Sequence, residues 1–174
     1  FILEARATAA IDHDHIVTIY QVGDHNGVPY LVMKYLEGQT LEDLLRKRKL
    51  LDPLESVRIA RQIADGLNAA HSHNLIHRDI KPANILISFD GRPMLIDFNM
   101  AINAQAGKSS FDGGTLAYMA PEQLESYQDG ARVATVSTDI FAAGLTVLEY
   151  LSGNLPIGHY RGRLCEILPQ MIAE

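Results

Sequence analysis

The sequence predicts an α+β fold with a β-containing N-terminal part and a mainly helical C-terminal part. Two β-rich runs, residues 16–22 and 29–35, flank the pair Asn26-Gly27, which is typical of a tight hairpin turn. Beyond position 52, apolar residues recur mainly at helical spacing. No long polar, Pro- and Gly-rich run separates the two parts, so we expect a single domain.

Composition excludes several classes of protein. The 174 residues are 47% hydrophobic and 21% charged, which is ordinary for a globular protein. A net charge of −6 argues against nucleic acid as the main partner, because phosphate binding needs a basic surface. The longest apolar stretch, residues 140–151, is too short to span a bilayer and contains Glu149, so we expect a buried helix and no membrane segment. The single cysteine, Cys165, excludes an internal disulfide and fits a reducing compartment.

The first elements follow from propensity and capping. Residues 1–10 are strong helix formers, and the predicted hairpin of two strands comes next. Residues 34–40, "KYLEGQT", form a short connection that we interpret as a hinge. Thr40 begins a helix, because Asp43 follows it at the spacing of a capping box.

A longer helix begins at Asp52 and Pro53, an acidic cap followed by a residue that suits a first helical turn. Its apolar positions recur at helical spacing: Val57, Ala60, Ile63, Ala64, Leu67 and Ala70. A second small hairpin is expected from the apolar runs 85–88 and 93–96, which are joined at Asp90-Gly91. Residues 99–118 read as a loop, and helices are expected near Pro121 and over 138–151.

Chemistry is concentrated in the loop "HRDIKPANILI", residues 77–87. Asp79 can accept or orient the proton of a hydroxyl nucleophile, and Lys81 can neutralise charge on a transferring phosphoryl group. Asn84 offers an amide oxygen of the kind that Mg²⁺ accepts, and Asp97 follows an apolar strand as a second oxygen ligand. A base, a cation, an amide and a carboxylate together indicate phosphoryl transfer.

These residues also carry a family resemblance. The spacing of His77-Arg78-Asp79 and Asn84 resembles the catalytic loop of protein kinases, with Asp97-Phe98 where the family has its DFG motif. Ala120-Pro121-Glu122 resembles the family's APE motif. Lys81, together with the run "GTLAYMAPEQ", is similar to bacterial eukaryotic-like serine/threonine kinases.

The resemblance implies roles in catalysis. Asp79 would be the catalytic base and Lys81 would contact the γ-phosphate of ATP. Asn84 and Asp97 would hold Mg²⁺. Glu4 would be the glutamate of the family's αC helix, which pairs with an ATP-contacting lysine.

The resemblance implies a nucleotide site and a hydrophobic spine as well. Met33 would be the gatekeeper, and backbone groups of Lys34 and Leu36 would hold adenine, with Leu86 packed under the ring. The regulatory spine would consist of Thr8, Ile19, His77 and Phe98.

Regulation is expected in the activation segment, from Asp97 to Glu122. Arg78 would receive a phosphate carried by Ser109 or Ser110. Thr115 would lie against the catalytic loop. Asp139 would tie the backbone of that loop to the helix that follows the segment.

The expected domain is a single partial kinase domain over residues 1–174, running from the αC helix to about the αG region of the family fold. It divides into an N-lobe remnant (1–33), a hinge (34–40) and a partial C-lobe (41–174). The Gly-rich loop, the strand with the ATP-contacting lysine and the last helices are missing from it, so we expect the isolated chain to transfer no phosphate. Asn99 stands where the DFG motif has glycine.

The predicted function is therefore a serine/threonine protein kinase with ATP and Mg²⁺ as cofactors and a protein as substrate. The predicted location is the cytoplasm, including the case of the cytoplasmic part of a membrane-anchored kinase. The alternative is a kinase-like binding module without catalysis, which retention of Asp79, Lys81, Asn84 and Asp97 disfavours. An aminoglycoside-type phosphotransferase is a weaker alternative, because the segment ending in "APE" serves protein substrates.

Overall fold

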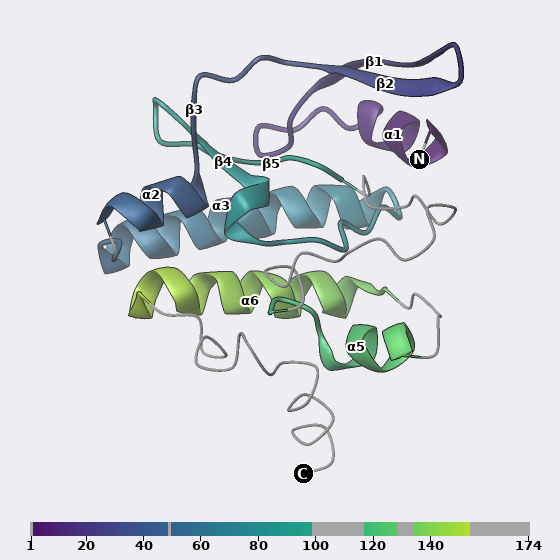
Figure 1. Ribbon diagram of the computed structural model, residues 1–174. Helices are drawn as coiled ribbons and strands as arrows, with labels where there is room; N and C mark the ends of the chain where they lie inside the picture. The colour runs from purple at the N-terminus through teal and green to yellow at the C-terminus, as the bar shows by residue number, and fades with distance from the viewer. Residues whose placement is uncertain (1, 49, 99–116, 129–133, 154–174) are drawn as a thin grey trace.

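The computed structural model describes residues 2–48, 50–98, 117–128 and 134–153 (Figure 1). A two-stranded ribbon and a short helix lie at one end, a small three-stranded sheet follows, and the longest helices lie beyond it. The arrangement confirms the predicted α+β class, with strands in the N-terminal part and helices dominating the C-terminal part.

The N-terminal part consists of α1 (Ile2–Ala9) and the antiparallel strands β1 (Ile19–His25) and β2 (Val28–Met33). Asn26 and Gly27 both adopt positive φ, 54° and 79°, as the predicted tight turn requires. The first strand begins later than the predicted residue 16. Ile16 instead forms a parallel bridge to Leu95, which ties this part of the chain to the small sheet.

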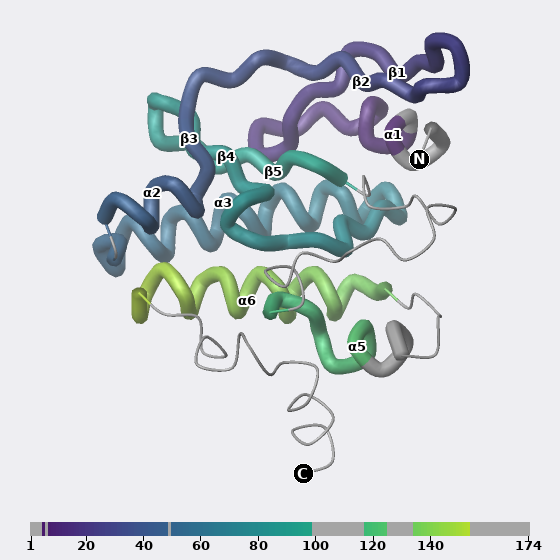
Figure 2. Tube along the Cα trace, in the orientation of Figure 1, coloured from purple at the N-terminus to yellow at the C-terminus, as the bar shows by residue number. Residues whose placement is uncertain are grey.

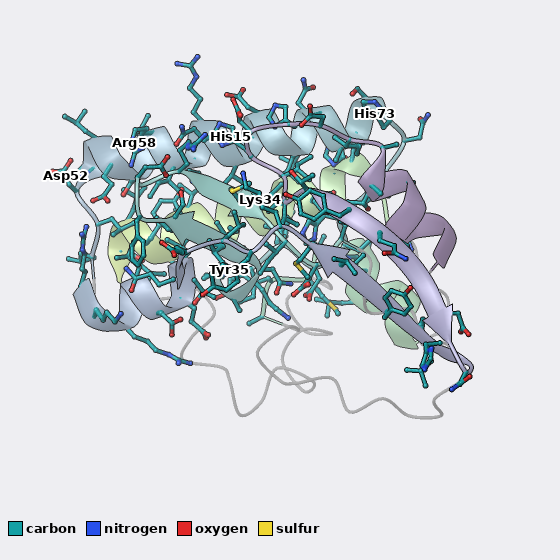
Figure 3. All side chains as sticks on the ribbon, turned by 90° about the horizontal axis from the view of Figure 1, so that it is seen from above. His15, Lys34, Tyr35, Asp52, Arg58 and His73 are labelled. Carbon is teal, nitrogen blue, oxygen red and sulfur yellow. The ribbon has the colours of Figure 1, made fainter. Side chains whose placement is uncertain are left out.

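The segment before β1 also packs on the longest helix. The His15 ring donates from Nδ1 to the Pro93 carbonyl at 3.0 Å. A Cβ added at Gly66 would lie 2.9 Å from the His15 carbonyl oxygen, so glycine allows the two backbones to approach. Figure 3 shows His15 beside this helix when the molecule is seen from above.

The next helices begin where their caps predict. α2 (Leu41–Arg48) follows Thr40, whose Oγ1 accepts the Asp43 amide at 3.1 Å. α3 (Pro53–Ser72) follows Asp52, whose side chain accepts the Leu54 amide at 2.9 Å. Both capping predictions are confirmed.

The small sheet contains a strand that the sequence did not predict. Its order is β3 (Gly38–Thr40), β4 (Ile85–Ser88), β5 (Pro93–Leu95), all antiparallel. The predicted hairpin of β4 and β5 is confirmed, whereas β3 lies in the stretch interpreted only as a hinge. Three residues are too few for a periodic signal, and β3 forms because β4 offers it an open edge.

The C-terminal part contains α5 (Pro121–Gln128) and α6 (Val136–Ser152), which ends at Gly153 with φ of 72°. α3 lies between the small sheet and α6 (Figure 1), and the core lies around it. The largest fully buried apolar side chains among the described residues are Tyr150, Ile16, Leu41, Ile59, Ile80, Ile85 and Leu95. Among the described helices, none is long and apolar enough to cross a membrane.

Candidate active site

The loop between α3 and β4 is anchored by a buried carboxylate on α6. Asp139 is 1% exposed. Its Oδ1 accepts the Arg78 amide and its Oδ2 accepts the His77 amide, both at 2.8 Å. The His71 ring, at the end of α3, donates from Nε2 to the same Oδ2, also at 2.8 Å. Figure 2 shows the chain between α3 and β4 returning alongside α3. The two bonds to Asp139 fix the backbone of this loop to α6.

His77 is buried and uses both of its ring nitrogens. Nε2 lies 2.9 Å from the Ile96 carbonyl and must donate to it, because a carbonyl only accepts. Nδ1 is then the acceptor, and the Asp79 amide points to it at 3.4 Å. Burial lowers the pKa of His77 below its ordinary value, against the opposing effect of the Asp139 carboxylate. His77 is therefore held neutral, with its ring 4.5 Å from the Phe98 ring.

Two residues of the site have left-handed backbones. Arg78 has φ of 71° and Asp97 has φ of 60°. Neither is glycine, so each conformation costs energy that its surroundings must offset. Asn99, which stands where the DFG motif has glycine, lies outside the described residues.

Asp79, Lys81 and Asn84 form a connected group. Lys81 Nζ lies 2.9 Å from Asp79 Oδ2. The Asn84 amide donates from Nδ2 to the same Oδ2 and to the Asp79 carbonyl, each at 2.8 Å. A 3-10 turn over Pro82–Asn84 brings the amide back to Asp79. The carboxylate is thus held by a cation and an amide before any substrate arrives.

Asn84 and Asp97 lie at the same end of the β4–β5 hairpin. Asn84 directly precedes β4, and its carbonyl accepts the Ile96 amide at 3.1 Å. Because the Asn84 nitrogen is used toward Asp79, its amide oxygen is the atom available for a metal ion. Burial raises the pKa of the Asp97 carboxyl, and the nearby Asp79 carboxylate acts in the same direction. An amide oxygen and a poorly solvated carboxylate are a donor set that suits Mg²⁺.

Comparison with known proteins decides the family. A family model described as "Protein kinase domain" matches residues 1–171. The chain belongs to the protein kinase family.

Several bacterial kinases are similar to this chain. Serine/threonine-protein kinase PknL of Mycobacterium tuberculosis is 40% identical over 159 residues, which cover 90% of this chain and 39% of PknL. Serine/threonine-protein kinase PrkC of Bacillus subtilis is 35% identical over 156 residues, covering 88% of this chain and 23% of PrkC. Probable serine/threonine-protein kinase pknA2 of Bifidobacterium longum is 37% identical over 156 residues, covering 88% of this chain and 20% of pknA2. The chain thus spans 20% to 39% of the length of these three relatives.

The residues predicted for nucleotide binding lie in β2, in the segment that follows it and in β4. Lys34 and Leu36 belong to the segment that joins β2 to β3, and Figure 3 shows Lys34 over the small sheet. The Lys34 amide donates to the Thr18 carbonyl at 2.9 Å. The Lys34 carbonyl is therefore the backbone group of this residue that could bond to an adenine. Leu86 lies half-buried in β4, paired with Thr40 of β3. Met33, the predicted gatekeeper, is 38% exposed.

The four predicted spine residues are all buried. Thr8 is 1% exposed and Ile19 is 9% exposed. His77 and Phe98 are in ring contact, so the structure brings these two members together. Contact of the remaining members with this pair stays a prediction.

Other predicted positions are only partly covered by the structure. Glu4 lies on α1, and its side chain is outside the described part of the chain. Ser109, Ser110 and Thr115 lie outside the described residues. Phosphorylation of the two serines and the place of Thr115 against the catalytic loop stay predictions.

One contact of the kinase site was missed by the sequence reasoning. Gln123, on α5, donates from Nε2 to the Arg78 carbonyl at 3.4 Å. It stands at the third position of its helix, where glutamine predicts a local cap. Nothing in that pattern predicts a partner 45 positions earlier in the chain.

A polar pocket of about 600 Å³ lies elsewhere, between the segment 12–15 and α3. Asp65 and Asn68 line it from the helix. It contains none of the residues predicted for phosphoryl transfer, so we do not assign the reaction to it.

Proposed function

We propose that this chain carries the catalytic centre of a serine/threonine protein kinase, which transfers the γ-phosphoryl group of ATP to a hydroxyl of a protein substrate. The observation that supports this most is the state of Asp79. Its carboxylate is held at 2.9 Å by Lys81 and at 2.8 Å by Asn84, on a loop whose backbone is fixed to α6 by Asp139.

In the proposed reaction, Asp79 accepts a hydrogen bond from the substrate hydroxyl and takes its proton as the phosphoryl group is transferred. Both Lys81 and Asn84 bond to Oδ2, so Oδ1 is the oxygen that faces the hydroxyl. Lys81 stabilises the negative charge that the transferring group carries. The preset geometry lowers the barrier because the base needs no reorientation when substrate binds.

Asn84 and Asp97 are the residues that would hold Mg²⁺, which neutralises phosphate charge when it is bound. The Lys34 carbonyl and the Leu36 amide would hold the adenine edge, with Leu86 beneath the ring. Arg78 would bind a phosphate on the activation segment. The proposed location of this activity is the cytoplasm, including the cytoplasmic part of a membrane-anchored kinase.

The experiment uses the full-length gene product, ATP labelled in the γ-position and a generic basic protein substrate. We expect labelling on serine or threonine, and Asp79→Asn should reduce kcat by roughly 10²–10⁴-fold. Asp65→Asn is the matched control, because it makes the same chemical change at an exposed carboxylate on α3, which forms an exposed ion pair with Arg61 at 4.0 Å.

Two results would argue for the non-catalytic binding module instead. One is a parent protein that transfers no phosphate to itself or to any substrate. The other is labelling that Asp79→Asn leaves unchanged.

A further inference from the structure

The peptide group that joins Arg78 to Asp79 is bonded at both of its polar ends. Its N–H, on Asp79, points to His77 Nδ1 at 3.4 Å. Its carbonyl, on Arg78, accepts from Gln123 Nε2 at 3.4 Å. This peptide precedes the proposed base directly, so its orientation determines where the Asp79 carboxylate points.

The same peptide group follows a strained residue. Arg78 has φ of 71°, in the left-handed region that a side chain disfavours. Asp139 holds the N–H side of Arg78 at 2.8 Å. Gln123 is the partner on the carbonyl side, so the strained residue is held on both sides along the backbone.

Gln123 makes two different bonds with one planar amide. Its Oε1 accepts the Ala120 amide at 3.0 Å, which caps the first turn of α5. Its Nε2 reaches the catalytic loop at Arg78. Ala120 is fully buried, so the start of the helix is itself fixed in the core.

We propose that Gln123 is a positioning residue for phosphoryl transfer, which holds the Arg78–Asp79 peptide and thereby orients the Asp79 carboxylate. The proposal rests on the proposed kinase function. It also makes α5 a second anchor of the catalytic loop, beside the Asp139 anchor from α6.

The simpler explanation is that Gln123 only caps its own helix. Chemistry separates the two explanations, because glutamate serves the cap as well as glutamine does. A carboxylate accepts the Ala120 amide but cannot donate to the Arg78 carbonyl, and its charge repels that oxygen. Gln123→Glu therefore keeps the cap and removes the bond to the Arg78 carbonyl.

The kinetic test compares Gln123→Glu with the parent in the full-length gene product. We expect kcat to fall roughly 10- to 100-fold with the KM for ATP within about twofold, since a small misplacement of a reacting group can cost about 10²-fold. Gln21→Glu, on the exposed strand β1, is the control for the added charge. A Gln123→Glu protein with the parent's kcat would overturn the proposal.

Gln123→Ala removes both bonds and reports the cost of losing the cap. We expect Gln123→Glu to melt close to the parent and above Gln123→Ala. If Gln123→Glu and Gln123→Ala have the same melting temperature, the carboxylate has not kept the cap. Hydrogen exchange then decides whether Gln123 holds the Arg78–Asp79 peptide.

Amide hydrogen exchange gives a readout that does not depend on activity. Under native conditions, the peptide containing residues 77–81 should exchange faster in Gln123→Glu than in the parent. Equal exchange would overturn the proposal even if the parent transfers phosphate. If the parent transfers no phosphate but the variant exchanges faster, Gln123 does hold the Arg78–Asp79 peptide, and it is the proposed kinase function that is wrong.

Discussion

His77 shows how one buried side chain couples the catalytic loop to pH. Burial lowers its pKa, although the carboxylates of Asp139, Asp79 and Asp97 and the Ile96 carbonyl all favour the charged form. In the unfolded chain the ring is solvated and has an ordinary pKa of about 6.5. At a pH between the folded-state pKa and the unfolded-state pKa of His77, the unfolded state binds more protons than the folded state. The stability that neutral His77 contributes is therefore complete above about pH 6.5 and is lost as the pH falls.

We therefore predict that acidification from pH 7.5 to 5.5 lowers the melting temperature of the kinase domain less in His77→Phe than in the parent. The variant should also be less stable at pH 7.5 by about 1–3 kcal/mol, because the Ile96 carbonyl loses its donor. Thermal melts at the two pH values measure both effects. If parent and variant lose the same number of degrees on acidification, His77 is not the group that titrates.

Among the described strands, β3 is the one whose existence the sequence did not predict, and Gly38 allows it to lie close to β4. A Cβ added at Gly38 would lie 2.2 Å from the Ile87 carbonyl oxygen and 2.9 Å from the Ser88 Cα. Both are backbone atoms of β4, so they cannot move aside without breaking the pairing. The close approach of β3 to β4 therefore requires glycine.

Gly38→Ala should destabilise the domain by about 2 kcal/mol or more, because it forces the two strands apart. Gly144→Ala is the matched control, since a Cβ there meets nothing within 4 Å. Gly144 lies inside α6, where alanine should stabilise by up to about 1 kcal/mol. Urea unfolding of both variants checks the pair, and a Gly38→Ala protein as stable as the parent would mean that β3 does not lie this close to β4.

The other elements could be predicted because their signals are local. Asp52 with Pro53 marks the start of α3, and Asn26-Gly27 marks the turn of the first hairpin. β1 begins later than its β-rich run does. Ile16 is used in a bridge to Leu95, and no local pattern contains a partner so distant in the chain.

At the scale of the whole molecule, the candidate site combines segments that only the fold brings together. The motifs around Asp79 and Asp97 could be recognised from spacing, and the resemblance to protein kinases implied that Asp139 anchors the loop. The local geometry of these residues could not be predicted from the sequence. The strained backbone of Arg78, the tautomer of His77 and the contact from Gln123 all depend on tertiary packing. The expectation that residues 1–174 alone transfer no phosphate stays a prediction.

We propose that Asp79 and Asp97 have separate roles: Asp79 acts on the substrate hydroxyl and Asp97 holds the metal. The most direct measurement is Mg²⁺-dependent ATP binding and kcat for Asp79→Asn and Asp97→Asn in the full-length gene product. We predict that Asp79→Asn lowers kcat by roughly 10²-fold or more with near-parent ATP affinity. Asp97→Asn should weaken Mg²⁺-dependent ATP binding as well as turnover, because it removes a metal ligand. Equal loss of ATP binding in the two variants, or parent-like turnover in either, would contradict the account.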